Sequence, residues 1–167
     1  MTFKAEISKY QDALIRSVQE LIRIKSVHEP ALPGKPFGEG VDQALQYVLN
    51  LAESMGFTTR NLDGYCGYAE YGEGDLYIGI LSHVDICPEG EMWGVPPYGG
   101  VIRENRIYGR GSLDNKGPLL AALYALKMVQ DSGRKLNKKI RLIVGTDEQR
   151  YYRDMQHYLS QEKPPIA

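Results

Sequence analysis

The sequence predicts an α/β fold of three layers, with a largely parallel central sheet flanked by helices. Segments whose apolar residues recur at helical spacing alternate along the chain with short apolar, β-branched runs typical of strands. Residues 76–81 form an almost continuously apolar run, which is the pattern of a strand buried on both faces of a sheet. Buried strands alternating with helices favour parallel pairing, because a helix then crosses from one strand to the next.

Each element follows from its own pattern. Amphipathic spacing predicts helices over residues 5–25, from residue 41 to a stop at Gly56, and over residues 117–131 and 154–161. Proline and glycine punctuation predicts a loop over residues 29–40. Strands are expected over residues 57–62, 66–71, 76–81 and 139–144, with a short hairpin over residues 100–108.

Length and charge exclude several classes of protein. The chain has 167 residues, enough for one domain with its own core. Its net charge is −1 and its basic residues are scattered, so a nucleic acid or a membrane surface is not an expected partner, whereas a small neutral or zwitterionic molecule is. Cys66 and Cys87 are too few for a disulfide framework. With no apolar leader or membrane-spanning run, a cytoplasmic protein is expected.

Two acidic positions could belong to a metal site. His83 ends an apolar run and Asp85 follows it, and a ligating imidazole commonly needs a carboxylate to fix its tautomer. A structural histidine is the alternative. Asp114 lies on a glycine-rich turn before a helix, where its two oxygens could bridge two cations or could cap the helix.

A third group of polar residues follows the strand expected at 139–144. Asp147 and Glu148 are adjacent acids, which repel each other unless they are solvated or neutralised by metal or base chemistry. An exposed acidic turn is the alternative. His28 and His157 have no acidic neighbours in the sequence that indicate ligation, and Lys116 is expected to be structural. Trp93 and Tyr98 are expected to pack the loop beside the site.

In this order, the motifs resemble the metallo-aminoacylase and carboxypeptidase superfamily of zinc peptidases. The likeness is greatest to the bacterial dipeptidase V branch, the Xaa-His or carnosinase-like dipeptidases, and it covers nearly the whole chain. The motifs that carry it are Ser82-His83-Val84-Asp85, Trp93-Gly94-Val95-Pro96-Pro97-Tyr98, Gly109-Arg110-Gly111-Ser112-Leu113-Asp114-Asn115-Lys116-Gly117 and Gly145-Thr146-Asp147-Glu148.

The resemblance implies a hydrolase that cleaves dipeptides or N-acyl amino acids with two zinc ions. It implies that His83 binds one zinc and that Asp85 orients His83. It further implies that Asp114 bridges both ions, that its bond to Asn115 is a cis peptide, and that Glu148 is the general base.

Gln149 departs from this pattern, because the family places a glutamate ligand there. An uncharged amide anchors a cation less well than a carboxylate, so the activity is expected to be impaired. Arg150 is expected to add a positive charge near that metal position.

The resemblance also implies that residues 1–167 form a partial catalytic domain. The lid domain, the C-terminal catalytic segment and the other metal ligands would lie outside the sequence. An unpaired sheet edge would then favour a homo-oligomer or a complementing C-terminal fragment.

Two other functions stay open at this point. The first is a non-catalytic remnant or interaction module of the same fold. The second is a nucleotide-binding domain, which is disfavoured because Gly109-Arg110-Gly111 lacks the third glycine of a dinucleotide fingerprint.

Overall fold

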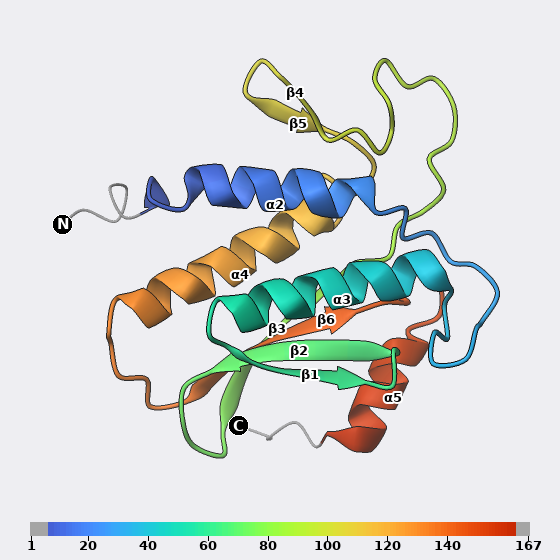
Figure 1. The fold of residues 1–167 in the computed structure, drawn as a ribbon. Helices are drawn as coiled ribbons and strands as arrows, with labels where there is room; N and C mark the ends of the chain where they lie inside the picture. The colour runs from blue at the N-terminus through green and yellow to red at the C-terminus, as the bar shows by residue number, and fades with distance from the viewer. Residues whose placement is uncertain (1–6, 163–167) are drawn as a thin grey trace.

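The computed structural model describes residues 7–162 as a four-stranded sheet with helices on both faces (Figure 1). In chain order the elements are α2 (Gln11–Arg23), α3 (Glu39–Ser54), β1 (Thr58–Leu62), β2 (Cys66–Tyr71), β3 (Tyr77–His83), β4 (Val101–Arg103), β5 (Arg106–Tyr108), α4 (Lys116–Asp131), β6 (Lys139–Gly145) and α5 (Arg153–Gln161). Within this described part, no helix is long and apolar enough to cross a membrane.

Almost every expected element is present within a few residues of its predicted bounds. The helix expected from residue 5 begins at Gln11, and residues 5 and 6 lie outside the described part of the chain. Gly56 follows the end of α3 with a φ of +87°, a conformation that glycine adopts readily, so the predicted helix stop is confirmed.

The three-layer α/β arrangement is confirmed, but the expectation of a largely parallel sheet is wrong. The strand order is β1-β2-β6-β3, and only β3 and β6 are parallel. Strands β1 and β2 are joined by residues 63–65 alone, and a parallel pair needs a much longer crossover. Asp63 and Gly64 both have positive φ, as a tight hairpin turn requires.

The one parallel pair places the candidate site. After β3 the chain forms the β4–β5 hairpin and then α4, which returns it to β6 beside β3. In the register of this pair, His83 lies opposite Gly145. The residues that follow β3 and β6 therefore emerge side by side at the carboxyl ends of both strands, where open α/β sheets gather their functional groups.

Two apolar clusters fix the sheet between its helices. Helices α2, α3 and α4 cover one face, and α5 packs on the other (Figure 1). The larger cluster joins the first three helices to the sheet and contains Leu21, Leu45, Val48, Leu120, Leu123, Leu142 and Val144. The smaller cluster lies under α5 and contains Leu62, Cys66, Tyr68, Ile143 and Tyr158.

Strand β3 is not buried on both faces as its sequence predicted. It is an edge strand of the four-stranded sheet, and the side chains of Ile78 and Leu81 are more than half exposed, at 56% and 58%. Leu76 and Ile80 are exposed as well. A run of apolar residues shows that a strand can be buried, but the pairing of its edge depends on segments distant in sequence.

Candidate metal centre

His83, the last residue of β3, is held in one orientation by Asp85. Its imidazole is 7% exposed. The Nδ1 atom lies 3.1 Å from the Asp85 backbone oxygen and 3.2 Å from Asp85 Oδ1. Since both partners are acceptors, Nδ1 carries a proton and donates it. The second nitrogen, Nε2, then has a free lone pair whenever the ring is neutral.

That second nitrogen faces two carboxylates. Nε2 lies 3.3 Å from Asp114 Oδ1 and 3.5 Å from Glu148 Oε2. A lone pair directed at carboxylate oxygens is repelled unless a proton or a metal cation lies between them. Burial lowers the pKa of His83, but the hydrogen bond and charge of Asp85 and the charge of Glu148 outweigh it, so the pKa lies above its usual value. The arrangement therefore requires either a proton or a metal cation at Nε2.

Asp85 connects both strand ends, and its side chain is completely buried. Besides His83, it accepts the backbone N–H groups of Glu148 at 3.3 Å and Gln149 at 2.9 Å. Burial raises the pKa of Asp85, but hydrogen bonds from His28, His83 and the Gln149 backbone lower it by a larger amount. The pKa of Asp85 therefore lies well below its usual range. Asp85 is therefore an anion that fixes the chain after β6 against the chain after β3.

Asp114 does not cap the helix that follows it. The N-cap of α4 is Asn115, and no side-chain hydrogen bond caps that helix. The Asp114 carboxylate is instead 67% exposed and contacts His83. The Asp114–Asn115 peptide bond is cis, as the resemblance implied. Lys116 is structural, as expected, because its Nζ donates to the backbone oxygens of Leu21 and Ile24 at the end of α2.

The two adjacent acids after β6 have different surroundings. Asp147 is completely buried and accepts two side-chain hydrogen bonds from Arg153, at 2.7 and 3.0 Å. The alternative interpretation of an exposed acidic turn is therefore wrong for Asp147. Glu148 is partly exposed, and its Oε1 accepts the Tyr152 hydroxyl at 2.9 Å. Of these two acids, only Glu148 has its carboxylate beside His83.

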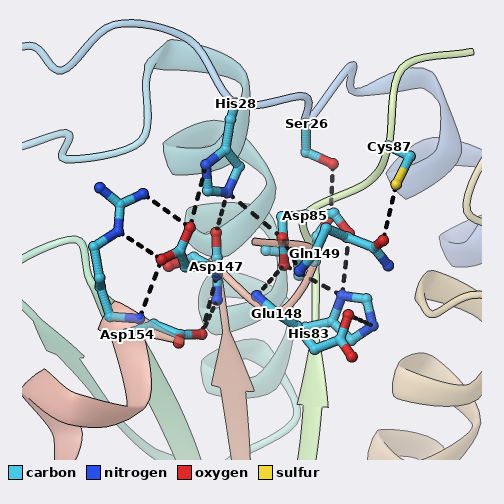
Figure 2. Close-up of polar contacts among 12 residues, drawn as sticks. Ser26, His28, His83, Asp85, Cys87, Asp147, Glu148, Gln149 and Asp154 are labelled. Carbon is cyan, nitrogen blue, oxygen red and sulfur yellow. Dashed lines mark hydrogen bonds and ion pairs between the residues drawn. The ribbon is translucent and has the colours of Figure 1, made fainter. Parts of the chain in front are cut away.

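His28 is a buried part of this region that sequence reasoning missed (Figure 2). Its Nε2 lies 2.8 Å from the Thr146 backbone oxygen and 3.5 Å from Asp85, and its Nδ1 lies 3.3 Å from Asp147. Ser26 fixes this segment, since its hydroxyl donates to the Val84 backbone oxygen. The sequence holds no local signal for this placement, because both acids lie far along the chain from His28.

Gln149 joins the site through its side chain as well as its backbone. Its Nε2 donates to Asp114 Oδ2 at 3.1 Å. Its Oε1 accepts the Cys87 thiol at 2.9 Å (Figure 2). Arg150 is exposed, and within residues 7–162 its side chain forms no hydrogen bond or ion pair with these residues. The arginine that pairs with an acid of this region is Arg153, which contacts Asp147.

The aromatic residues of the segment between β3 and β4 pack this segment on itself. Trp93 Nε1 donates to the Glu89 backbone oxygen at 2.7 Å, and the Tyr98 hydroxyl donates to Glu89 Oε2 at 2.6 Å. The Arg110 guanidinium lies over the Trp93 ring. These contacts agree with a packing role for both residues.

The side chains at this site meet the requirements of a metal ion only in part. His83 Nε2 and Asp114 are oriented toward one another and suit a divalent cation. Across residues 7–162, however, no three histidine, cysteine or acidic side chains are already gathered around one point. At Gln149 the group turned toward Asp114 is an amide N–H donor, which cannot bind a cation. Two side chains that can donate to a cation thus face each other, and the neutral side chain of Gln149 lies beside them.

Fold and site together define an α/β protein with a candidate cation centre at the carboxyl ends of two parallel strands. Residues 79–162, half of the chain, match the model of peptidase family M20/M25/M40. The chain belongs to this family, whose members are metal-dependent.

Known proteins resemble the chain over nearly its whole length. It is 48% identical over 167 residues to "Putative dipeptidase YtjP" of Bacillus subtilis (strain 168), covering 99% of this chain and 36% of that protein. It is 37% identical over 165 residues to "Putative dipeptidase SAUSA300_1697" of Staphylococcus aureus (strain USA300), covering 98% of this chain and 35% of that protein. The chain therefore spans about a third of the length of these curated relatives.

The structure of human carnosine dipeptidase 1 has the same fold over 94% of this chain and 36% of its own, with a TM-score of 0.78 and 22% identity. The di-peptidase Dug1p from Saccharomyces cerevisiae has a TM-score of 0.75 at 17% identity, over 95% of this chain and 36% of its own. Both confirm the fold.

Proposed function

We propose that this chain carries part of the active site of a zinc-dependent dipeptidase, which hydrolyses dipeptides or N-acyl amino acids. One observation carries the proposal: His83, fixed by Asp85, directs Nε2 at both Asp114 and Glu148. The names of the relatives support dipeptides as the substrate class. Because the chain spans about a third of those relatives, the activity of the whole protein is part of the proposal.

The site residues have separate roles in this proposal. His83 and Asp114 would hold the zinc, and Asp85 keeps His83 Nδ1 protonated so that Nε2 is free to bind. The chemistry that zinc would supply there is polarisation of the scissile carbonyl and a lowered pKa of water. Glu148 accepts a proton from the attacking water and returns it to the leaving amine nitrogen. The Tyr152 hydroxyl holds Glu148 Oε1, which leaves Oε2 for this transfer.

A second candidate is a non-catalytic interaction module of the same fold. It is favoured by the neutral side chain of Gln149 beside Asp114 and by the exposed apolar residues of β3. The first weakens metal binding, and the second gives the sheet a surface on which another chain can pack.

Hydrolysis of a panel of dipeptides and N-acyl amino acids, with zinc, cobalt or manganese added, distinguishes the two functions. We expect turnover that falls at least ~100-fold in Glu148→Gln, the range for loss of a general base. Glu73→Gln is the matched control, because Glu73 is exposed and precedes β3, at the opposite end of that strand from His83. Absence of turnover with every metal would contradict the dipeptidase proposal and favour the interaction module.

A further inference from the structure

His28 contacts the ends of both parallel strands from a third segment of the chain, the one that follows α2 (Figure 2). Its Nε2 lies 2.8 Å from the Thr146 backbone oxygen and 3.5 Å from Asp85 Oδ2, and its Nδ1 lies 3.3 Å from Asp147 Oδ1. Asp85 follows β3, whereas Thr146 and Asp147 follow β6. One buried ring therefore joins the two strand ends that form the candidate metal centre.

The His28 ring is held in place by its own backbone and by a stacked neighbour. The Ser26 hydroxyl donates to the Val84 backbone oxygen, and the Ile86 backbone N–H donates to the Ser26 backbone oxygen at 3.0 Å. The His28 ring stacks on Phe37 with ring centroids 5.0 Å apart, and its side chain is 4% exposed. A functional group supported in this way keeps one orientation, so the ring nitrogens are preorganised.

The Nε2 side of the ring acts on Asp85. Nε2 carries a proton, because both groups that it faces, the Thr146 backbone oxygen and Asp85 Oδ2, are acceptors. Asp85 Oδ2 also accepts the Gln149 backbone N–H at 2.9 Å, whereas Asp85 Oδ1 lies 3.2 Å from His83 Nδ1. Each carboxylate oxygen thus has its own donors, which fixes the rotation of the carboxylate and directs Oδ1 at His83.

The Nδ1 side of the ring faces a carboxylate that has other partners. Asp147 accepts two hydrogen bonds from the Arg153 guanidinium, at 2.7 and 3.0 Å. It also accepts the Arg153 backbone N–H at 3.1 Å. Loss of the Nδ1 contact would therefore leave Asp147 paired, so an effect of His28 on the centre is expected to come from the Nε2 side.

We propose that His28 is a positioning residue of this centre, which orients the Asp85 carboxylate and through it the His83 ring. With Asp85 fixed, the proton of a neutral His83 stays on Nδ1 and the lone pair of Nε2 is available to a cation. Without the Nε2 contact of His28, the carboxylate can rotate and His83 can carry its proton on Nε2. The inference rests on the proposed function, because it assigns a further residue to the same centre.

Two substitutions separate the two sides of the ring. In His28→Gln the side-chain N–H groups can take the place of Nε2 and donate to Asp85, whereas in His28→Asn they take the place of Nδ1 and face Asp147. Both variants lose the ring stacked on Phe37. A purely structural role therefore predicts similar effects of the two substitutions, and a positioning role predicts that only His28→Asn disturbs the centre.

NMR of the imidazole nitrogens, in alkaline buffer where His83 is neutral, measures its tautomer without any metal. We expect the Nδ1–H form in the wild type and in His28→Gln, and a mixture with the Nε2–H form in His28→Asn. Leu45→Ala is the control for lowered stability, because Leu45 is buried in the cluster of α2, α3 and α4, and it should keep the Nδ1–H form.

The same spectra test the inference in the wild type alone, where His28 Nε2 should carry a proton. An unprotonated Nε2 would overturn the inference even if a variant does not fold. The same His83 tautomer in His28→Gln and His28→Asn would overturn it as well.

Titration with zinc keeps the inference separate from the proposed function. Zinc affinity should fall roughly 10-fold in His28→Asn, the lower end of the effect of residues that support metal ligands, and should match the wild type in His28→Gln. Unchanged affinity in His28→Asn would overturn the inference and leave the proposed function standing. Absence of zinc binding in the wild type would contradict the proposed function, whereas the tautomer of His83 would still test the inference.

Discussion

Asn in place of Asp85 tests whether this buried carboxylate holds the ends of β3 and β6 together. The two carboxylate oxygens accept N–H groups from His83, Glu148 and Gln149, and one of them faces His28 at 3.5 Å. An amide of the same shape has one acceptor oxygen, so its NH₂ group must face at least one of these donors.

The expected cost follows from these contacts. The variant loses at least one hydrogen bond to a charged group, about 1.5–3 kcal/mol, and leaves a buried donor unsatisfied, about 1–3 kcal/mol. Together these give about 2.5–6 kcal/mol, which spans the range of about 3–5 kcal/mol for breaking a buried ion pair. With a urea m-value of about 2 kcal/mol/M, the unfolding midpoint should fall by roughly 2 M.

Urea unfolding of Asp85→Asn and the wild type, followed by circular dichroism, measures this cost. Asp63→Asn is the control, because the Asp63 carboxylate is exposed and its one ion pair among residues 7–162 is with His157 at the surface, so its cost should stay below ~1 kcal/mol.

The contribution of Asp85 to the free energy of unfolding depends on pH, and the direction of this dependence follows from its lowered pKa. The pKa of Asp85 is lower in the folded chain than in the unfolded chain, so its contribution is complete above pH ~4 and is lost as the pH falls further. The difference in free energy of unfolding between the wild type and Asp85→Asn should be constant near neutral pH and should become smaller in acid. A difference below ~1 kcal/mol at pH 7, or one that does not narrow, would refute the reasoning.

Three other substitutions test the surrounding structure. His28→Ala should destabilise the fold by about 2–4 kcal/mol, and a double-mutant cycle with Asp85→Asn in urea should show a coupling of about 1–3 kcal/mol, whereas additive effects would contradict their contact. Arg141→Met should cost about 1.5–3 kcal/mol by the same unfolding assay, because the half-buried Glu70 carboxylate loses its hydrogen bonds from the guanidinium and keeps only the longer contact with Lys139, at 3.4 Å, among the described residues. Gly145→Ala should lower the melting temperature by several degrees, because the added Cβ would lie 2.6 Å from an Asp154 oxygen; an unchanged melting temperature would contradict this close approach.

The sequence predicted local features of the fold well, because they depend on local patterns. Helical spacing located α3 and α4, and turn residues located the β4–β5 hairpin. The antiparallel hairpin of β1 and β2 was also readable, since Asp63-Gly64 is a strong tight-turn signal between two strands. Helix–strand alternation indicates parallel pairing, so it predicted the wrong direction for the pairing of β1 with β2.

Contacts between distant segments were harder to predict. The exposure of β3 depends on which segments lie beside it, and its apolar sequence does not encode that. His28 reaches Asp147 only because the segment after α2 is fixed against the chain after β3. The resemblance located His83, Asp85, Asp114 and Glu148, whereas the contact of Cys87 with Gln149 required the three-dimensional arrangement.

Calorimetric titration with zinc, applied to the wild type and to His83→Ala, tests the central claim most directly. The account predicts one cation per chain in the wild type and its loss in His83→Ala, because Nε2 is directed at Asp114. His157→Ala should bind as the wild type does, since His157 pairs with Asp63 at the surface. Absence of zinc binding in the wild type, or binding that His83→Ala leaves unchanged, would contradict the account.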